Sequence, residues 1–321
     1  MRYLVQRILR FAVVFFLVTF GLMVLMRLGM NKPGDPARTM LGGTVTQQQI
    51  DETTKAYHLD SPLIVQYGYW LKGMVSGDMG VSVQQNLHVT TYIKSRVLTT
   101  LFLGVYSLLL AMVVSIPIGV LQAYRRDSVR DKLFSGASFA FVAIPPVVMG
   151  VLLILVFVRW LHWFPRTGEK IYPWDDPKEH FRNFALPVLA LSLPVGAVFS
   201  RLLRGDMVRT LQSDFITLAS AKGVSTRRIL WRHGLRNSVF SVITAIGLQL
   251  AGIVGGAIVV EQLFNMKGMG TLLITAILSK DLFVVQALAA IIVFSVVVVN
   301  LLVDLSYAVV DPRIRQMRAL S

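Results

Sequence analysis

Long stretches without Asp, Glu, Lys or Arg dominate the pattern of apolar and polar positions along this chain. At a rise of 1.5 Å per residue, a helix needs about 20 apolar residues to cross the hydrocarbon core of a bilayer. Six stretches come close to that length or exceed it: residues 11–26, 97–124, 133–158, 183–200, 237–260 and 282–303. The pattern therefore predicts an all-α integral membrane protein with six transmembrane helices.

Several of these stretches contain proline, which cannot donate a backbone hydrogen bond inside a helix. The prolines are Pro117, Pro145, Pro146, Pro187 and Pro194. They are tolerated in membrane helices where neighbouring helices satisfy the freed backbone groups. Each stretch is therefore still predicted to be one span.

The first apolar stretch follows a basic start, as in a secretory signal peptide. Residues 27–30, Arg-Leu-Gly-Met, do not form a small-x-small cleavage site. We therefore expect a retained helix.

The predicted spans divide the chain into four regions. Residues 1–29 hold the first transmembrane helix, 30–96 form a segment between helices 1 and 2, 97–310 form a transmembrane domain, and 311–321 form a C-terminal tail. Lys and Arg are densest before the first span, after the second, fourth and sixth spans, and sparser elsewhere. The positive-inside rule then predicts that both termini are cytoplasmic and that residues 30–96 are external.

The expected external segment contains signals for a short helix. Ser61 is expected as the N-cap and Pro62 as the first helical residue, ahead of an apolar pattern that should end at Gly77-Asp78. We expect a small folded cap on the outer membrane face.

Composition supports a membrane protein and excludes several other classes. The chain is 55% hydrophobic and 15% charged, whereas a soluble domain has about a quarter charged residues. Its net charge of +15 could also indicate a protein that binds nucleic acid, but no zinc-ligand spacing or aromatic–basic RNA-binding motif is present, so no nucleic-acid partner is expected.

Cysteine is absent, which excludes disulfides and thiolate metal sites, and the five histidines show no metal-ligand pairing. No phosphate-cradling Gly-x-x-x-x-Gly-Lys-Ser/Thr loop occurs, so this chain is not expected to hydrolyse ATP.

The stretch 201–236, between the fourth and fifth spans, is long enough to have internal structure. Asp214 can cap a helix that runs to Lys222, and Gly223 suits the left-handed residue that closes it. Ser225 can start a second short helix, from Thr226 to His233, with Gly234 after it.

Two interpretations of this stretch remain open from the pattern alone. Small residues at Ala219 and Ala221 would let the first helix lie deep in a groove of another protein. Arg227, Arg228 and Arg232 could pair with acids of such a partner, or rest on anionic lipid headgroups.

A family resemblance favours the first interpretation. Residues 214–223, Asp-Phe-Ile-Thr-Leu-Ala-Ser-Ala-Lys-Gly, and 233–237, His-Gly-Leu-Arg-Asn, resemble the cytoplasmic loop of binding-protein-dependent ABC importer permeases. The resemblance implies that a coupling-helix loop lies between helices 4 and 5. It implies an ATPase-coupling role for Asp214, Leu218, Ala219, Ala221, Lys222, Gly223, His233, Leu235, Arg236 and Asn237.

Other segments resemble one branch of these importers, the first permease subunit of the dipeptide/oligopeptide type. They are residues 33–37, Pro-Gly-Asp-Pro-Ala, 59–62, Leu-Asp-Ser-Pro, 77–82, Gly-Asp-Met-Gly-Val-Ser, and 311–315, Asp-Pro-Arg-Ile-Arg. The chain departs from that pattern at His58, where Gly is usual, and at Phe283, where Pro is common. A third departure is at residues 267–270, Lys-Gly-Met-Gly, where the family usually has Pro before the first Gly.

The resemblance implies a set of partners. A second homologous permease would complete a heterodimer, and either two ATP-binding subunits or one fused ATPase would carry ATP and magnesium, leaving no cofactor in this chain. An external substrate-binding protein would deliver the substrate, and the location would be a bacterial or archaeal cell membrane.

Peptides are the expected substrate, with nickel chelates or sugars as alternatives. Intramembrane polar groups that face a bundle interior could line the path, and Gln249, Glu261 and Gln286 are the candidates. A secondary transporter is the rival class, but no internal repeat is evident and ionisable groups cluster at the ends of spans.

Overall fold

The structure of the chain is a computed structural model that describes residues 2–28, 35–41, 45–82, 87–165 and 171–310. The expected C-terminal tail, 311–321, lies outside the described residues, as do Pro33 and Gly34. The chain divides into two compact units, and each is described by itself. Unit 1 comprises Met1–Leu98 and Gly268–Val298, and unit 2 comprises Thr99–Lys267 and Val299–Ser321.

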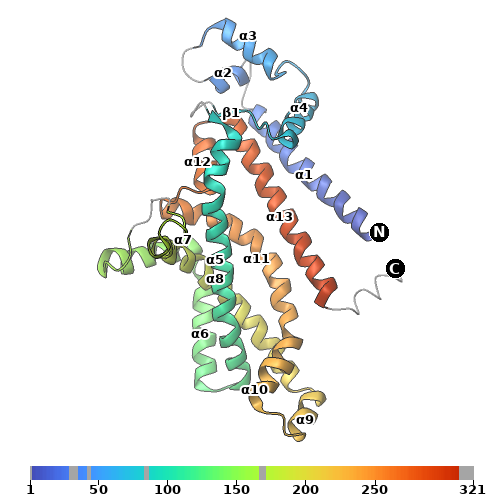
Figure 1. Cartoon of the computed structure of the whole chain (residues 1–321), viewed down its shortest axis with the longest axis vertical. Helices are drawn as coiled ribbons and strands as arrows, with labels where there is room; N and C mark the ends of the chain where they lie inside the picture. The colour runs from blue at the N-terminus through green and yellow to red at the C-terminus, as the bar shows by residue number, and fades with distance from the viewer. Residues whose placement is uncertain (1, 29–34, 42–44, 83–86, 166–170, 311–321) are drawn as a thin grey trace. The chain divides into compact units, whose positions relative to one another are not determined.

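Helices account for almost all of the regular structure (Figure 1), as the apolar pattern predicts. In chain order the elements are α1 (Arg2–Leu28), α2 (Asp35–Leu41), α3 (Gln47–Ala56), α4 (Leu63–Ser76), β1 (Val81–Ser82), β2 (Leu87–His88), α5 (Val89–Tyr124), α6 (Val129–Ala143), α7 (Pro146–Leu153), the π-helix η1 (Ile154–Trp160), α8 (Pro177–Leu211), α9 (Asp214–Ala221), α10 (Thr226–Arg228), the π-helix η2 (Ile229–Gly234), α11 (Leu235–Leu263), α12 (Met269–Leu278) and α13 (Leu282–Val310). The all-α prediction is confirmed; β1 and β2 form only a two-residue antiparallel pair.

Four helices are long and apolar enough to cross a membrane: Ile8–Leu28, Val89–Tyr124, Pro177–Leu211 and Leu282–Leu301. Two further candidates are bent pairs of helices, Val129–Ala143 with Pro146–Trp160 at 105°, and Thr226–Gly247 with Gly252–Leu263 at 56°. The described residues therefore hold up to six candidate spans, the expected number, if each bent pair counts as one.

The consecutive prolines produce the sharpest of these bends. Pro117, Pro187 and Pro194 lie inside the continuous helices α5 and α8, whereas α6 ends just before Pro145 and Pro146. Ile144 is extended, with φ −89° and ψ 117°, because a residue before proline is pushed away from the helical region. Pro145 itself precedes a proline and is extended too, so two adjacent positions leave the helix. The expected span over 133–158 is thus a bent pair of helices, broken at the two prolines.

Unit 1 contains the segment that was expected to be external. Its helix α4 begins at Leu63, with Pro62 as N-cap, so it starts one residue later than predicted from Ser61. Its end agrees with the prediction, because Gly77 is the left-handed C-cap with φ 86°.

Hydrogen bonds tie this segment to the membrane helices of unit 1. The hydroxyls of Thr19 on α1 and Tyr67 on α4 lie 2.8 Å apart, and both are buried. Ser82 donates to the buried carboxylate of Asp281, at 2.6 Å, and the same carboxylate accepts the backbone N–H of Val284 in the first turn of α13. Asp281 therefore caps α13 and holds β1 to its start.

Two of the three departures from the family pattern, His58 and Phe283, lie in unit 1. His58 has φ 51°, in the left-handed region that favours glycine, and its ring stacks on Tyr69 at a centroid distance of 4.0 Å. Phe283 packs against Tyr57 at 4.9 Å. In both places a ring–ring contact accompanies the unusual residue.

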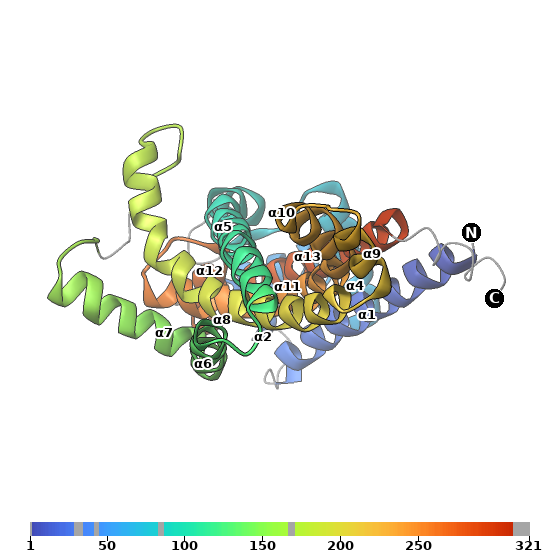
Figure 2. The ribbon, with the colours of Figure 1, turned by 90° about the horizontal axis from the view of Figure 1, so that it is seen from below.

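Unit 2 is organised around α8, which packs against α6, α7 and α11. One buried cluster includes Leu103, Phe184, Leu191, Val260 and Phe264. A second cluster, at the other end of α8, includes Phe199, Leu203, Met207, Val242 and Ala245. In Figure 2, the α7–η1 segment and the N-terminal end of α8 extend to the left, away from α9 and α10.

Candidate functional site

The helix α9 belongs to the segment that connects α8 and α11, the two helices that pack most extensively in unit 2. It lies with α10 and the α5–α6 turn at one end of unit 2 (Figure 1). Near its base, the hydroxyls of Thr210 on α8 and Ser238 on α11 lie 2.8 Å apart. The end of α8 and the start of α11, which flank the connecting segment, are therefore held together.

The start of α9 differs by one residue from the prediction. Ser213 is the N-cap, with extended backbone, and Asp214 is the first helical residue instead of the cap. The Ser213 hydroxyl donates to the Thr210 carbonyl at 2.5 Å and makes no cap bond. Asp214 still places a negative charge on the first turn, where the helix dipole favours it.

The end of α9 confirms the role expected of Gly223. This residue has φ 76°, and its N–H donates to the Ser220 carbonyl at 3.0 Å. The N–H of Val224 donates to the carbonyl of Ala219 at 3.1 Å. This pair of bonds is the Schellman motif, in which a residue with positive φ reverses the chain directly after the helix.

The two faces of α9 differ in burial. Ile216 is 6% exposed and anchors the helix to unit 2, whereas Phe215 is 46% exposed and Leu218 is 56% exposed. Ala219 is half-buried, and Ala221 is exposed. The outer face thus presents two large apolar side chains beside a small one, with Asp214 and Lys222 exposed at its two ends.

The second short helix does not end at Gly234, so that prediction is wrong. Residues 226–247 continue from α10 through the π-helical η2 into α11 without a break. A Cβ atom on Gly234 would lie 3.0 Å from the Met207 Cε atom, so glycine here permits close packing against α8 instead of ending a helix.

Among the coupling residues predicted at 233–237, some stabilise the fold and others lie at the surface. The Asn237 amide donates to the carbonyl of His233 at 2.7 Å, across the junction of the π-helix and α11. Leu235 packs against the cluster that contains Leu203 and Met207, while Arg236 is exposed. The structure therefore brings Asp214, Leu218, Ala221, Lys222 and Arg236 to the surface and uses Leu235 in the core.

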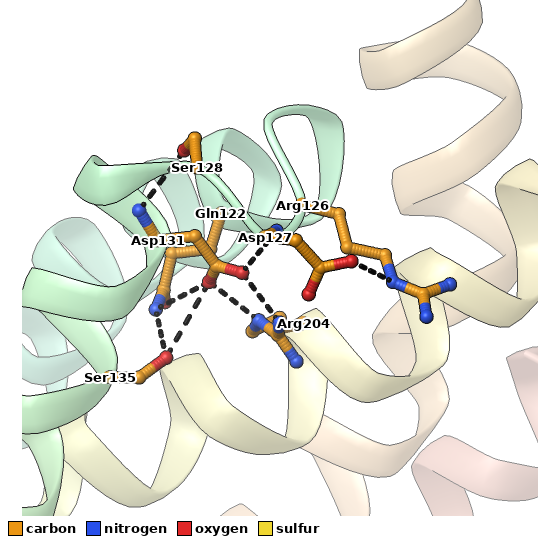
Figure 3. Close-up of polar contacts among 7 residues, drawn as sticks. All are labelled: Gln122, Arg126, Asp127, Ser128, Asp131, Ser135 and Arg204. Atoms are coloured by element: carbon orange, nitrogen blue, oxygen red, sulfur yellow. Dashed lines mark hydrogen bonds and ion pairs between the residues drawn. The ribbon is translucent and has the colours of Figure 1, made fainter.

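A buried ion pair at the same end of unit 2 was missed by the sequence analysis (Figure 3). Arg204 on α8 donates from Nε to Asp131 Oδ1 at 2.7 Å and from Nη2 to Asp131 Oδ2 at 2.6 Å. The Asp131 carboxylate also accepts the backbone N–H of Asp127 at 2.9 Å, and the Ser128 hydroxyl caps the N–H of Asp131 at 3.2 Å. The pair fastens the α5–α6 turn to the part of α8 that leads into α9.

The three candidates for the substrate path divide between the two units. Gln249 is half-buried on α11, and Glu261, twelve residues later on the same helix, is fully buried and accepts a hydrogen bond from the Thr100 hydroxyl. Gln286 belongs to unit 1, where it is 6% exposed and lines a cavity of about 270 Å³ with Arg27 and Trp70. Their role in transport stays a prediction.

Comparison with known proteins gives matches along the whole chain. Residues 115–316 match the family described as binding-protein-dependent transport system inner membrane component, and residues 1–104 match the family that describes the N-terminal part of such membrane components.

Relatives of the chain are similar over most of their length. The oligopeptide transport system permease protein AppB of Bacillus subtilis is 38% identical over 284 residues, covering 88% of this chain and 90% of the relative. The probable peptide ABC transporter permease protein y4tP of Sinorhizobium fredii is 32% identical over 318 residues, covering 98% and 99%. The glutathione transport system permease protein GsiC of Escherichia coli is 32% identical over 315 residues, covering 98% and 99%.

Proposed function

The chain belongs to the family of binding-protein-dependent transport system inner membrane components, and we propose that it is a permease subunit of an ATP-driven peptide importer. Relatives named for peptides, oligopeptides and glutathione support a peptide substrate. Nickel chelates or sugars are the alternative cargo, and a secondary transporter is the less favoured alternative class.

The proposed assembly has four kinds of component. This chain and a second, homologous permease form a heterodimer in a bacterial or archaeal cell membrane, each providing half of the translocation path. Two ATP-binding subunits, or one fused ATPase, hold ATP and magnesium on the cytoplasmic side, and an external binding protein delivers the substrate. In this arrangement both termini of the chain are cytoplasmic and residues 30–96 are external.

The four regions keep their expected roles in this proposal. Residues 1–29 carry the first span, 97–310 form the transmembrane domain of the importer, and 311–321 form a cytoplasmic tail. Gln249, Glu261 and Gln286 are proposed to contribute to the substrate path.

One observation carries the proposal: α9 is a short helix with a docked inner face and an apolar outer face. Phe215 and Leu218 are about half exposed, whereas Ile216 on the inner face is 6% exposed. A soluble partner that covers these two side chains would remove apolar surface from water, at about 25 cal/mol for each Å². Ala221 and Gly223 leave room for that partner to approach the backbone.

The connections of α9 to its neighbouring helices offer a route by which movement of the ATPase could reach the membrane spans. Closure of the ATP-binding subunits would displace α9, which follows α8 in the chain and packs against η2, and η2 continues into α11. Both helices would then shift together, and the Asp131–Arg204 pair would carry α6 with α8. Such a shift drives alternating access only if the ATPase binds one permease conformation more tightly than the other.

Cysteine cross-linking tests the docking of α9, and the chain suits it because its native sequence contains no cysteine. In the assembled importer, Leu218→Cys should cross-link to an ATP-binding subunit that carries cysteines in its docking cleft. Val75→Cys is the matched control, since Val75 is 83% exposed but lies on α4 of unit 1. Cross-linking from Val75 and none from Leu218 would contradict the proposed orientation and the coupling role together.

A further inference from the structure

A basic hollow lies on the surface of α10, η2 and the first turn of α11. It has a volume of about 480 Å³ and is lined by Ser225, Arg227, Arg228, Trp231, Arg232 and Arg236. We refer to these six residues as the basic hollow. All six side chains are exposed.

Helical spacing gathers these residues. Arg228, Arg232 and Arg236 follow one another at intervals of four, and Arg227 and Trp231 share the same interval. Residues four apart lie on one face of a helix, so the two rows are adjacent. The unbroken path from α10 through η2 into α11 is what allows the rows to continue past Gly234.

The four guanidinium groups have no acidic partner among the described residues. In the same part of the chain, Arg126, Arg204 and Arg209 each form an ion pair with an aspartate. Like charges four residues apart destabilise a helix. The basic hollow is therefore arranged for an anion that comes from outside the chain.

The hollow lies at the end of a candidate membrane span, because the apolar helix of that span begins at Thr226. Trp231 is 46% exposed beside the arginines, and tryptophan is enriched at the level of lipid headgroups. Arg236 is only two residues before Ser238, which is buried between α8 and α11. Lipid phosphates lie at the ends of membrane spans, so they are within reach of arginines placed there.

We propose that the basic hollow binds the phosphate-bearing headgroup of an anionic phospholipid in the cytoplasmic leaflet. The proposal rests on the cytoplasmic location of this loop in the proposed function. Guanidinium groups bind phosphate oxygens through paired N–H donors, and the indole ring of Trp231 covers the glycerol region of the lipid. The bound lipid neutralises the row of arginines and steadies η2, on which one end of α9 is mounted.

Quenching of Trp231 by brominated lipids tests the proposal on the full chain in lipid nanodiscs, without the ATPase. Phosphatidylglycerol brominated near its headgroup is compared with equally brominated phosphatidylcholine at the same mole fraction. The signal of Trp231 is obtained by subtracting the Trp231→Phe variant, which keeps the other tryptophans. Because each basic residue near an anionic surface adds attraction, we expect phosphatidylglycerol to quench about threefold more strongly.

Two variants with the same change of net charge separate the basic hollow from general surface charge. The Arg228→Gln/Arg232→Gln/Arg236→Gln variant should quench equally with both lipids. The Arg125→Gln/Arg130→Gln/Lys132→Gln variant should keep the preference, because those residues are exposed near the α5–α6 turn and do not line the hollow. If the triple variant of the hollow fails to fold, Arg232→Gln alone should reduce the preference.

Three results would overturn the proposal. Equal quenching of the native chain by the two lipids would show no headgroup preference. Loss of the preference in excess inorganic phosphate would identify a site for soluble anions. Loss of the preference when the ATP-binding subunits are added, together with failure of the triple variant to bind them, would assign the arginines to acids of the ATPase. Since the lipid measurement needs no ATPase and the Leu218 cross-link needs no anionic lipid, either hypothesis can fail alone.

Discussion

Arg204 on α8 donates two hydrogen bonds, of 2.7 and 2.6 Å, to the two carboxylate oxygens of Asp131 on α6. The Asp131 side chain is 3% exposed and the Arg204 side chain 29% exposed, so water reaches only one side of the pair. A planar guanidinium facing a carboxylate in this way fixes direction as well as distance. This contact therefore helps to fix the relative positions of α6 and α8 next to the α9 loop.

Removal of one partner of this pair should be costly. In Asp131→Leu, the Arg204 guanidinium keeps its place but loses its acceptor, and the N–H of Asp127 loses its acceptor too. Breaking a buried ion pair lowers the free energy of unfolding by about 3–5 kcal/mol. Because Arg204 is partly exposed, we expect a loss of about 2 kcal/mol here. The denaturation midpoint of the purified full chain in detergent measures the loss.

Two controls accompany this substitution. Arg209→Gln removes an exposed ion pair on the same helix and should change stability by less than about 0.5 kcal/mol. Asp131→Leu/Arg204→Leu removes both charges and should recover part of the stability. Equal losses for Asp131→Leu and Arg209→Gln would show that the buried pair contributes nothing specific.

Gly223 should tolerate asparagine better than valine. Its φ of 76° lies in the left-handed region, which costs other residues about 1–2 kcal/mol, but asparagine adopts it more readily than a β-branched residue. Open space surrounds the position, so the effect is conformational instead of steric. Gly223→Asn should retain most peptide uptake and Gly223→Val should lose it, at equal amounts of subunit in the membrane. Equal uptake by the two variants would contradict this.

Sequence reasoning located the spans and the α9 loop because both depend on local chemistry. A membrane selects runs of apolar residues, and Gly223 closes a helix for reasons contained in its own backbone. The starts of predicted helices were less accurate: the N-caps are Ser213 and Pro62, each one residue from the predicted position, because neighbouring residues compete for the cap.

The features that sequence reasoning missed depend on contacts between distant residues. Gly234 resembles a helix end until Met207 is seen against it. Asp131 lies between Arg130 and Lys132, in a stretch that resembles a solvated turn, and its partner is 73 residues away. The proline pair was visible in the sequence, but the 105° bend of the chain at that pair was not anticipated.

Asp281 should be needed for the order of unit 1. Its carboxylate accepts the Ser82 hydroxyl and the N–H of Val284, so Asp281→Ala removes a helix cap and leaves the Ser82 hydroxyl buried without this acceptor. Loss of a cap costs about 1 kcal/mol, and an unsatisfied buried hydroxyl adds about 1–3 kcal/mol. Limited proteolysis of the full chain should then cut residues 45–82 faster. Ser76→Ala is the control, since its hydroxyl is exposed, and equally fast cleavage of both variants would refute the role of Asp281.

A bulky side chain at Ala221 should separate docking from folding. Ala221 is exposed at the end of α9, so Ala221→Trp should leave the stability of the purified subunit within about 0.5 kcal/mol of native. If the ATP-binding subunit approaches the backbone of α9 here, the indole ring holds it off, and both co-purification of the ATPase and peptide uptake should be lost. Val129→Trp is the matched control, because Val129 is 83% exposed at the α5–α6 turn but lies off α9. An Ala221→Trp subunit that still co-purifies with its ATPase and transports normally would rule out close docking at this position, because no rearrangement within the chain could hide so large a ring.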